Sequence, residues 1–335
     1  MSSPTIKDVA KLAGVSISTV SRVMNDSKPV SPEARRKVLD AIEKLDFKPN
    51  ELARSLVMKR SNLIGVVVKD IGIPYMAQIV RGAEEIGRMY KYDILLSSTY
   101  GDLEQEKKII DFMFTKQVEG IILISEDIEP EVIFKLKDQT VPYIQLDKFW
   151  NIKDVHTVQI DYKEAMINMI NHIYDLGHKK ILFVKENQDT EIGQEKLKGY
   201  RQACDDLKLE KIEISSEGVS VKDGYEAGDK IFEMKDSKDI TCVSFSEDAQ
   251  AIGFINYCYD NNKKVPEDIS VSGFGDIPMT SIYRPTLTTV QEPYYDIGAV
   301  SMRTLVKVLK ENKIINEKAI LGSQIMKRES VKDIN

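Results

Sequence analysis

The first sixty residues place their hydrophobic side chains at helical spacing and contain no strand-like run. Apolar positions over 6–13 fall on one helical face, which predicts a first short helix. Gly14 then supplies a turn, and Ser16 is placed to cap a second helix whose Val20 and Val23 point inward. We therefore expect this stretch to form a small, purely helical unit.

A third helix is predicted from Ser31 onward, with Ser31 as N-cap and Pro32 at the first helical position. Its apolar residues recur at helical spacing as far as Leu45. The run Phe-Lys-Pro-Asn at 47–50 then interrupts the pattern, because a residue before proline disfavours helix. Asn50 can cap a short fourth helix over 51–58.

Beyond Ser61 the pattern changes to continuous apolar runs that alternate with amphipathic helical stretches. Apolar runs that are each followed by a helix are typical of buried parallel sheets. There are enough such units for two doubly wound α/β lobes, with a ligand crevice between them. The runs are 63–68, 94–96, 120–124, 143–146, 181–184, 242–245 and 269–274, and the intervening helices include 76–90, 104–116, 163–176 and 248–261.

The pattern predicts a helical headpiece over 1–60, which ends in the helix at about 50–58, and a two-lobed body over 61–335. We expect the chain to cross between the lobes near Asp161, Val290 and Leu321. An N-lobe would comprise about 61–160 and 291–321, and a C-lobe about 161–290 and 322–335. The helix Tyr295–Lys310 would then return to the N-lobe.

Charge separates the headpiece from the body. Residues 1–60 hold 12 lysines and arginines against 7 acidic residues, whereas the remainder holds 35 against 46 and the whole chain carries −6. A basic head on an acidic body is typical of a local polyanion-binding module attached to another domain.

Several other classes of protein are disfavoured. No stretch approaches the ~20 consecutive apolar residues of a membrane-spanning helix, and the N-terminus lacks the plan of a secretory signal. Three cysteines without a CxxC pair indicate reduced thiols. The chain has no GxxxxGKS/T phosphate loop, no helix-opening GxGxxG and no histidine with a metal-ligand neighbour. We expect a cytoplasmic protein that is not an enzyme and needs no metal or cofactor.

The second predicted helix has the residues expected of a helix that enters the major groove of DNA. Arg22 can pair with guanine O6 and N7, Ser18 can bond a base edge, and Ile17 can contact a thymine methyl. Ser16, at the start of this helix, belongs to the same candidate DNA-binding set. The hydroxyl and amide side chains suited to phosphate contacts are Thr5, Thr19, Ser21, Asn25 and Asn50.

Segments 5–16 (TIKDVAKLAGVS) and 18–25 (STVSRVMN) closely resemble the headpiece of the lactose/galactose repressor (LacI/GalR) family of bacterial transcription regulators. The resemblance continues through 47–56 (FKPNELARSL), the hinge-helix sequence of that family, which includes Ala53. It implies that the hinge helix folds on DNA and that Leu56 wedges into the central minor-groove step. Two heads related by a twofold axis would read half-sites about one turn, ~10 bp, apart, so a homodimer on double-stranded operator DNA is expected.

The body resembles periplasmic sugar-binding proteins, and most members of the family bind a small sugar or purine in the crevice. Three positions depart from that pattern: Lys196 replaces an arginine, Glu247 replaces a polar amide or similar residue, and Gly275 replaces the aspartate that typically grips sugar hydroxyls. A high-affinity sugar site of the usual kind is therefore not expected, unless the neighbouring Asp276 compensates. The candidate effector residues are Asp147, Lys196, Glu247 and Asp276.

Segments 89–94, 116–122 and 294–303 are similar to the catabolite control branch of the family in Gram-positive bacteria. In that branch the phosphocarrier protein HPr, phosphorylated on a serine, docks on the first lobe and promotes DNA binding. The resemblance implies that Arg303 pairs with the phosphoserine, that Asp296 meets basic groups of HPr and that Tyr295 lies beside them. Asp296 and Arg303 share a helical face, with the small Ala299 beside them to permit close approach.

Two alternative hypotheses remain open. A local repressor that responds to a small sugar or sugar phosphate is favoured by the wider family but weakened by Gly275 and Lys196. A solute-binding protein or an α/β enzyme would account for the lobes but not for residues 5–56. Trp150 fits either a crevice-lining or a packing role.

Overall fold

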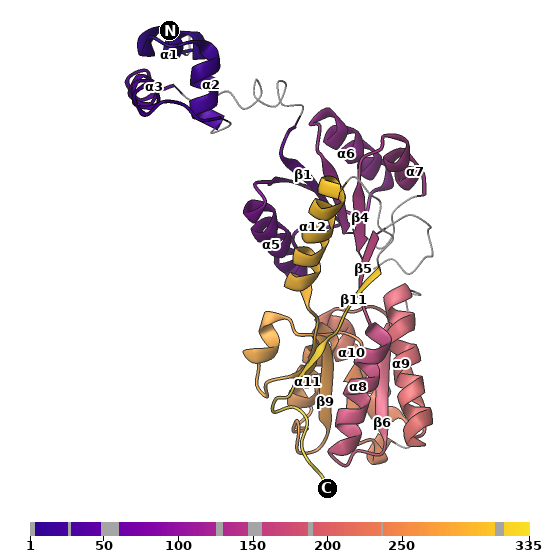
Figure 1. Cartoon of the computed structure of the whole chain (residues 1–335). Coiled ribbons are helices and arrows are strands. Elements are labelled where there is room, and N and C mark those ends of the chain that lie inside the picture. The colour runs from indigo at the N-terminus through magenta and orange to yellow at the C-terminus, as the bar shows by residue number, and fades with distance from the viewer. Residues whose placement is uncertain are drawn as a thin grey trace. The chain divides into compact units, whose positions relative to one another are not determined.

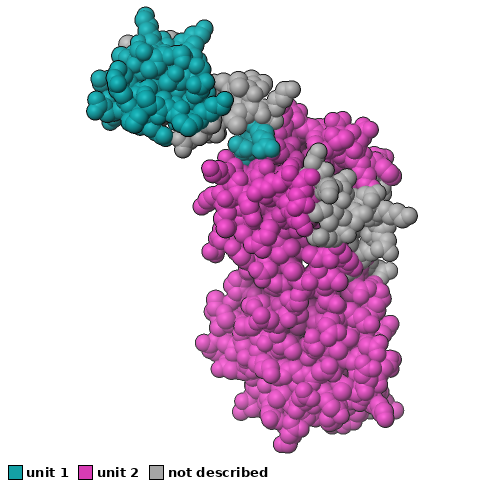
Figure 2. All heavy atoms as spheres, viewed as in Figure 1, with its two compact units in different colours: residues 1–62 teal, residues 63–335 magenta. Residues whose placement is uncertain are grey.

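The computed structural model describes residues 4–25, 28–47, 60–124, 130–146, 156–186, 190–235, 237–311 and 318–335. The chain divides into two compact units, residues 1–62 and residues 63–335, which Figure 2 colours separately. The first unit is the headpiece, and the second contains both α/β lobes. Each unit has a hydrophobic core of its own.

The headpiece contains helices α1 (Ile6–Ala13), α2 (Ile17–Asn25) and α3 (Pro32–Lys44). Gly14 ends α1 in the left-handed conformation, with a φ of 65°, which is the usual glycine signal for a helix end. The Ser16 hydroxyl accepts a hydrogen bond from Thr19 N at 3.2 Å, and Ser31 accepts one from Ala34 N at 3.3 Å. Both predicted N-caps are therefore confirmed.

Small and β-branched side chains form the headpiece core, which holds the three helices together. Ala10 on α1 is buried in this core. The buried residues of this core are Val9, Ala10, Ala13, Val20, Val23, Val38, Ala41 and Phe47.

The first lobe, the N-lobe, is built on a six-stranded sheet of order β11-β5-β4-β3-β1-β2. Every pairing within this sheet is parallel. The strands are β1 (Leu63–Val68), β2 (Asp93–Ser98), β3 (Gly120–Ile124), β4 (Tyr143–Leu146), β5 (His156–Ile160) and β11 (Lys318–Leu321).

The second lobe, the C-lobe, repeats this plan with the order β12-β10-β9-β8-β6-β7. Its pairings are parallel except that β12 runs antiparallel to β10. The strands are β6 (Ile181–Glu186), β7 (Ile212–Ser216), β8 (Cys242–Phe245), β9 (Ser270–Gly275), β10 (Thr288–Gln291) and β12 (Gln324–Met326).

Helices cover both faces of each sheet, as Figure 1 shows in part. In the N-lobe, α5 (Pro74–Met89) and α12 (Tyr294–Glu311) pack into one hydrophobic cluster, and α6 (Leu103–Thr115) and α7 (Pro130–Asp138) pack into another. In the C-lobe, α8 (Tyr162–Asp175) and α9 (Glu191–Leu207) lie opposite α10 (Val221–Glu233) and α11 (Asp248–Asp260). Short 3-10 turns occur at Ser237–Asp239 and at Pro278–Ser281, the latter labelled η2.

Three chain segments connect the lobes: β5 leads into α8, β10 leads into α12, and β11 leads into β12. Consequently α12 follows a C-lobe strand but packs beside α5 in the N-lobe (Figure 1). This packing is close, because a Cβ on Gly298 would collide with the carbonyl oxygen of Ile79, and a Cβ on Gly82 would collide with that of Tyr295. The two helices therefore meet almost backbone to backbone.

The predicted fold class is confirmed: an all-α helix-turn-helix headpiece precedes an α/β core of two doubly wound sheets. The predicted runs 120–124 and 143–146 coincide with β3 and β4. The expectation of parallel sheets is wrong only at β12, which pairs antiparallel with β10 because the chain enters the C-lobe sheet from the crevice, where the other strands of that sheet end.

Candidate DNA-reading helix, docking helix and inter-lobe pocket

One face of α2 is buried and the opposite face is open. Val20 and Val23 are buried in the headpiece core. Because successive helical residues are about 100° apart, Ser18 and Arg22 lie on the other side of the helix, whereas Ile17, three residues before Val20, lies at the edge of the open face. Ile17 is 45% exposed, and Ser18 and Arg22 are exposed as well. All three predicted base-reading residues are thus accessible, with Ser18 and Arg22 on one helical face.

Hydroxyl groups gather at the start of α2. Ser16 Oγ lies 2.8 Å from Ser18 Oγ and 2.9 Å from Thr19 Oγ1, so the three predicted contact residues form one network. At the start of α1, Thr5 donates from its backbone N and its hydroxyl to Asp8 Oδ2, at 2.8 and 2.7 Å. The hydrogen bond from the Thr5 hydroxyl lowers the pKa of Asp8 and keeps this carboxylate ionised beside the helix N-terminus.

The remaining headpiece predictions are only partly covered by the structure. Ser21 lies on α2 at intermediate exposure, and Asn25 is the last residue of that helix. The predicted hinge residues Asn50, Ala53 and Leu56 lie outside the described residues, as does the predicted effector residue Asp147.

The outer face of α12 carries the predicted docking residues. Asp296 and Arg303 are both exposed, and they are separated by two helical turns on the same side of the helix. Lys307, which sequence analysis did not select, is exposed one turn beyond Arg303. Its position four residues after Arg303, on the same helical face, could have identified it from the sequence. This face therefore presents one carboxylate followed by two cations.

Tyr295 is anchored to the neighbouring helix α5. Its hydroxyl donates to Glu85 Oε2 at 2.7 Å, and Arg81 Nε donates to Glu85 Oε1 at 2.9 Å. The hydrogen bonds from Arg81 and then Tyr295 lower the pKa of Glu85, so the carboxylate remains ionised between them. This chain of contacts fixes the Tyr295 ring at the junction of α5 and α12.

The expectation that Ala299 leaves an open face for a partner is wrong. Ala299 is 5% exposed because α5 already covers that side of α12, where Gly298 touches α5. The small residues of this helix serve the contact between α5 and α12. The accessible face lies on the side of Asp296 and Arg303.

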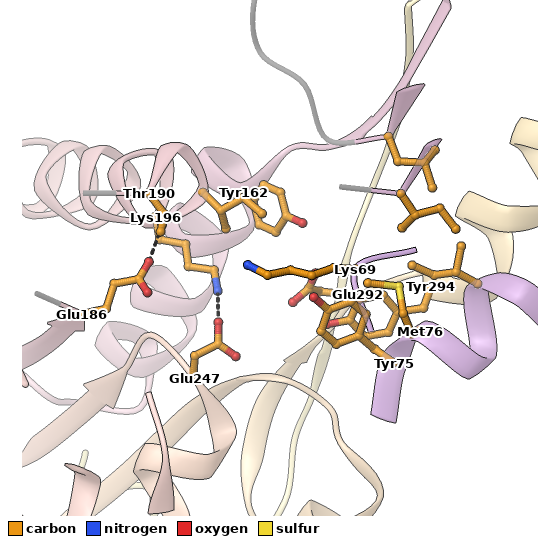
Figure 3. A pocket seen from close by; sticks show the side chains of 14 residues that line it. Lys69, Tyr75, Met76, Tyr162, Glu186, Thr190, Lys196, Glu247, Glu292 and Tyr294 are labelled. Carbon is orange, nitrogen blue, oxygen red and sulfur yellow. Dashed lines mark hydrogen bonds and ion pairs between the residues drawn. The ribbon is translucent and has the colours of Figure 1, made fainter. Parts of the chain in front are cut away.

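A cavity of about 140 Å³ lies between the two lobes (Figure 3). The N-lobe contributes mostly apolar side chains, among them Met76, Ile79, Ile124 and Leu146. The C-lobe and its connections contribute the polar groups Glu186, Lys196, Glu247 and Glu292. Two of the predicted effector residues, Lys196 and Glu247, therefore line the same pocket.

Lys196 is buried at the floor of this pocket, with 2% of its side chain exposed. Its ammonium donates to the Ser246 carbonyl at 2.9 Å and to Glu247 Oε1 at 2.8 Å. Burial lowers the pKa of Lys196, but the nearby carboxylates outweigh that effect and the net shift is upward. The lysine is thus a charged, internally paired group.

Asp276 does not line the pocket. Its Oδ1 accepts from Arg328 Nη2 at 2.6 Å, and its Oδ2 accepts from Gln291 Nε2 at 2.7 Å. Both carboxylate oxygens are therefore engaged within the C-lobe, and the structure gives Asp276 no route to compensate for Gly275.

Asp248 is buried behind the pocket, at the start of α11. Its carboxylate accepts from Thr289 Oγ1 at 2.5 Å and from Ile277 N at 2.9 Å. Burial nevertheless raises the pKa of Asp248 to about 7. A Cβ on Gly273 would collide with this carboxyl group, so the glycine makes room for it.

Sequence analysis missed several pocket residues that share one position in the topology. Lys69 follows β1, Glu186 ends β6, and Glu292 follows β10. The carboxyl ends of parallel strands face the crevice in doubly wound sheets, so the strand-end rule was the signal that could have found them. Tyr75, Tyr162 and Tyr294 come from helix starts, for which sequence offered no comparable signal.

Within the described residues, no group of three or more His, Cys, Asp or Glu residues is placed to hold a metal ion. No helix in the described ranges is long and apolar enough to cross a membrane. His178 is buried and contacts Thr241 Oγ1 at 2.9 Å and the Lys332 carbonyl at 3.1 Å, which accounts for it as a structural residue.

Comparison with known proteins places the chain in a family. The model for bacterial regulatory proteins of the lacI family matches residues 5–50, and that for a periplasmic binding protein-like domain matches residues 170–331. Catabolite control protein A of Priestia megaterium is 36% identical over 331 residues, which cover 98% of this chain and 99% of that protein. The chain belongs to the LacI family of bacterial regulatory proteins.

Other relatives agree with this assignment. The transcriptional regulator RegA of Clostridium saccharobutylicum is 34% identical over 97% of this LacI-family chain and 98% of its own. A crystal structure of the regulator CcpA of Lactococcus lactis has a TM-score of 0.71 at 28% identity, covering 81% of this chain and 99% of that one. A lac repressor dimer bound to operator and anti-inducer shares the fold, with a TM-score of 0.86 at 23% identity over 99% of this chain and 100% of that one. The LacI-family chain is thus a DNA-binding transcription regulator, close to catabolite control protein A.

Proposed function

We propose that this LacI-family regulator binds a pseudo-palindromic operator as a homodimer, and that serine-phosphorylated HPr promotes this binding by docking on α12 of the N-lobe. The observation that carries the proposal is the exposed pair Asp296 and Arg303 on one face of α12. It occurs in a chain that is similar to catabolite control protein A over nearly its whole length.

The accessible face of α2 supports the DNA-reading part. Arg22 is exposed there and can form a bidentate pair with guanine. We expect Arg22→Ala to cost roughly 1–3 kcal/mol of specific binding and much less of non-specific binding. Fluorescence anisotropy on an operator selected from random duplexes, with scrambled DNA as competitor, measures both. Lys37→Ala on α3, where Lys37 pairs with Glu33, is a matched control that should keep specificity.

Exposed apolar side chains around α11 support the homodimer. Tyr259 on α11 is 82% exposed, and Ile282 beside η2 is 71% exposed. Hydrogen bonds from Tyr225 to Asp260 and from Tyr283 to Asn256 tie the flanking segments to this helix. Large apolar groups gathered on one surface mark an association site, and a twofold operator calls for a second copy of the chain.

The chemistry of α12 suits a phosphorylated protein partner. The Arg303 guanidinium can form two parallel hydrogen bonds to a phosphate, the strongest side-chain arrangement for that group. Asp296, two turns earlier, can pair with a cation of the partner, while the anchored Tyr295 provides a fixed ring between them. One strong phosphate contact with neighbouring charge complementarity favours the phosphorylated form of the carrier.

Coupling between the two binding events follows from linkage. A partner that binds better to the DNA-competent conformation raises the affinity for DNA by the same free-energy difference. DNA must in turn raise the affinity for the carrier by an equal factor. Mutual enhancement is therefore the signature of this mechanism.

The deciding experiment measures operator affinity with and without serine-phosphorylated HPr. We expect enhancement in the wild type and its loss, about tenfold or more, in Arg303→Ala, because a charge-assisted contact is worth 1.5–3 kcal/mol. Lys198→Ala on α9, an exposed cation paired with Glu195, should retain the enhancement. Equal affinities with and without the carrier in the wild type would refute the proposal.

A further inference from the structure

The inter-lobe cavity has an acidic lining. Glu186, Glu247 and Glu292 face it from the C-lobe side and the β10–α12 connection, against the two cations Lys69 and Lys196 (Figure 3). Lys69 comes from the N-lobe and is exposed, whereas Lys196 is fully buried and is already paired with Glu247. Carboxylates therefore outnumber ammonium groups in a partly desolvated space, where charge acts more strongly than in water.

The pKa of Lys196 shows the sign of the electrostatic potential inside the cavity. Burial alone lowers the pKa of a lysine, and Lys196 is fully buried. Its pKa is nevertheless raised, because Glu247, Glu292 and Glu186 together outweigh the desolvation. The floor of the cavity is thus an environment that stabilises positive charge.

The rings of Tyr75, Tyr162 and Tyr294 line the cavity, and Phe274 contacts Lys196 without lining it. The Lys196 ammonium lies 4.1 Å from the ring centroid of Phe274 and 5.7 Å from that of Tyr162, so a cation already contacts ring faces here. Nearer the N-lobe, Tyr75 stacks on Tyr294 with ring centroids 4.7 Å apart. Acidic groups with aromatic faces are the combination that recognises organic ammonium compounds.

We propose that this cavity binds a small organic cation, with a protonated amine on a compact body, in place of a neutral sugar or a sugar phosphate. A phosphate dianion would meet three carboxylates, and the nearest buried cation is already engaged. Among the described residues, two groups that would hold sugar hydroxyls are also lost, because position 275 is glycine and Asp276 is held by Arg328. The proposal concerns the small-molecule site and does not depend on carrier docking.

The size of the cavity limits the ligand. A volume of about 140 Å³ is below the 300–1,000 Å³ of typical drug-sized sites and suits a short aliphatic amine. The diamine putrescine and its uncharged counterpart butane-1,4-diol differ only in the ammonium groups. They are therefore a matched pair of probes for the proposed selectivity.

The test is isothermal titration calorimetry on the full-length chain with putrescine, butane-1,4-diol, glucose and glucose 6-phosphate. We expect putrescine alone to bind, and Glu186→Gln and Glu292→Gln each to weaken binding about tenfold or more, because a charged contact is lost. Glu226→Gln, which removes an exposed carboxylate from α10 outside the cavity, should bind as the wild type does. Thermal melts of each variant establish that it is folded.

Salt provides an independent readout. The affinity for putrescine should fall as ionic strength rises, because dissolved ions screen the attraction between the ammonium groups and the carboxylates of a site that solvent can reach. Equal binding of the diamine and the diol, preference for glucose or glucose 6-phosphate, or unchanged affinity in both glutamate variants would each overturn the proposal. Absence of any heat with putrescine at millimolar concentration would overturn it as well.

Discussion

The two lobes have the same strand order but place their charges differently. In the N-lobe, ion pairs such as Arg81–Glu85 and Arg88–Glu84 lie on exposed helix faces. In the C-lobe, Lys196 on α9 and Asp248 at the start of α11 are buried, and the Arg328–Asp276 pair is largely covered. Both lobes carry exposed ion pairs, such as Lys222–Glu226 in the C-lobe, but buried and paired charges of this kind gather in the C-lobe.

This difference separates the lobes by the kind of ligand each can recognise. Exposed charges on α12 can meet the surface of another protein but are weak individually, because solvent screens them. Buried charges in the C-lobe act at low dielectric and respond to small changes in occupancy or protonation. The contrast teaches that a protein partner and a small molecule can be recognised at different places on one core, the outer face of α12 and the cavity between the lobes.

The largest expected effect tests the C-lobe surface around α11. We expect Tyr259→Asp combined with Ile282→Asp to weaken self-association by about two orders of magnitude, because each change puts a charge into an apolar contact. Sedimentation velocity across a concentration series measures this. Phe134→Asp on α7, which is 69% exposed in the N-lobe, is the matched control and should leave the dimer intact. If the control variant alone dissociated, the self-association surface would lie on the N-lobe and not on the C-lobe.

The next effect concerns the buried Asp248 of the C-lobe, whose ionisation makes the free energy of unfolding depend on pH. Burial raises the pKa of Asp248 to about 7, whereas in the unfolded chain this carboxyl ionises near ~3.9. The folded state therefore binds the extra proton between these values, so the group destabilises the fold increasingly as pH rises and fully above about 7. Asp248→Asn should stabilise the chain by about 2–3 kcal/mol more at pH 8 than at pH 5.

Chemical denaturation of wild type and Asp248→Asn at both pH values measures this difference. Asp205→Asn, which removes an exposed carboxylate paired with Lys211, is the control and should shift stability equally at the two pH values. A pH-independent difference for Asp248→Asn would show that its carboxyl is ionised throughout.

The smallest effect concerns the N-lobe surface. We expect Glu85→Ala to weaken carrier binding about two- to fivefold, because Tyr295 loses the acceptor that fixes its hydroxyl. Tyr295→Phe should give a similar loss, since it removes the other half of the same hydrogen bond. Glu84→Ala, which breaks the adjacent pair with Arg88, should bind the carrier as the wild type does. Surface plasmon resonance with phosphorylated carrier resolves changes of this size.

The sequence predicted those elements whose signal is local. Ser16, Gly14 and Ser31 specify helix ends through their own backbone and side-chain chemistry, and each is found where expected. Long apolar runs predicted β1, β3 and β4 because buried parallel strands are uniformly hydrophobic. Strands such as β7 (Ile212–Ser216) and β11 were not singled out, because their mixed polar composition matches edge positions at half burial.

What sequence analysis could not provide depends on contacts between distant residues. Asp276 is next to position 275 in the sequence, but Arg328, far along the chain, holds its carboxylate. Ala299 is covered by α5, and nothing in the local spacing of α12 identifies this partner helix. The acidic lining of the pocket is different, because the rule that parallel strand ends face the crevice could have identified its carboxylates from the sequence.

The last strands of both sheets come from one short stretch of chain, residues 318–326. β11 closes the N-lobe sheet beside β5, and β12 closes the C-lobe sheet beside β10. During synthesis a ribosome must pass residue 318 before either sheet gains its outermost strand, so both nascent lobes keep an unpaired edge until then. A premature stop codon ahead of that point would remove the outermost strand from both lobes at once. The completion of both sheets therefore depends on this one stretch.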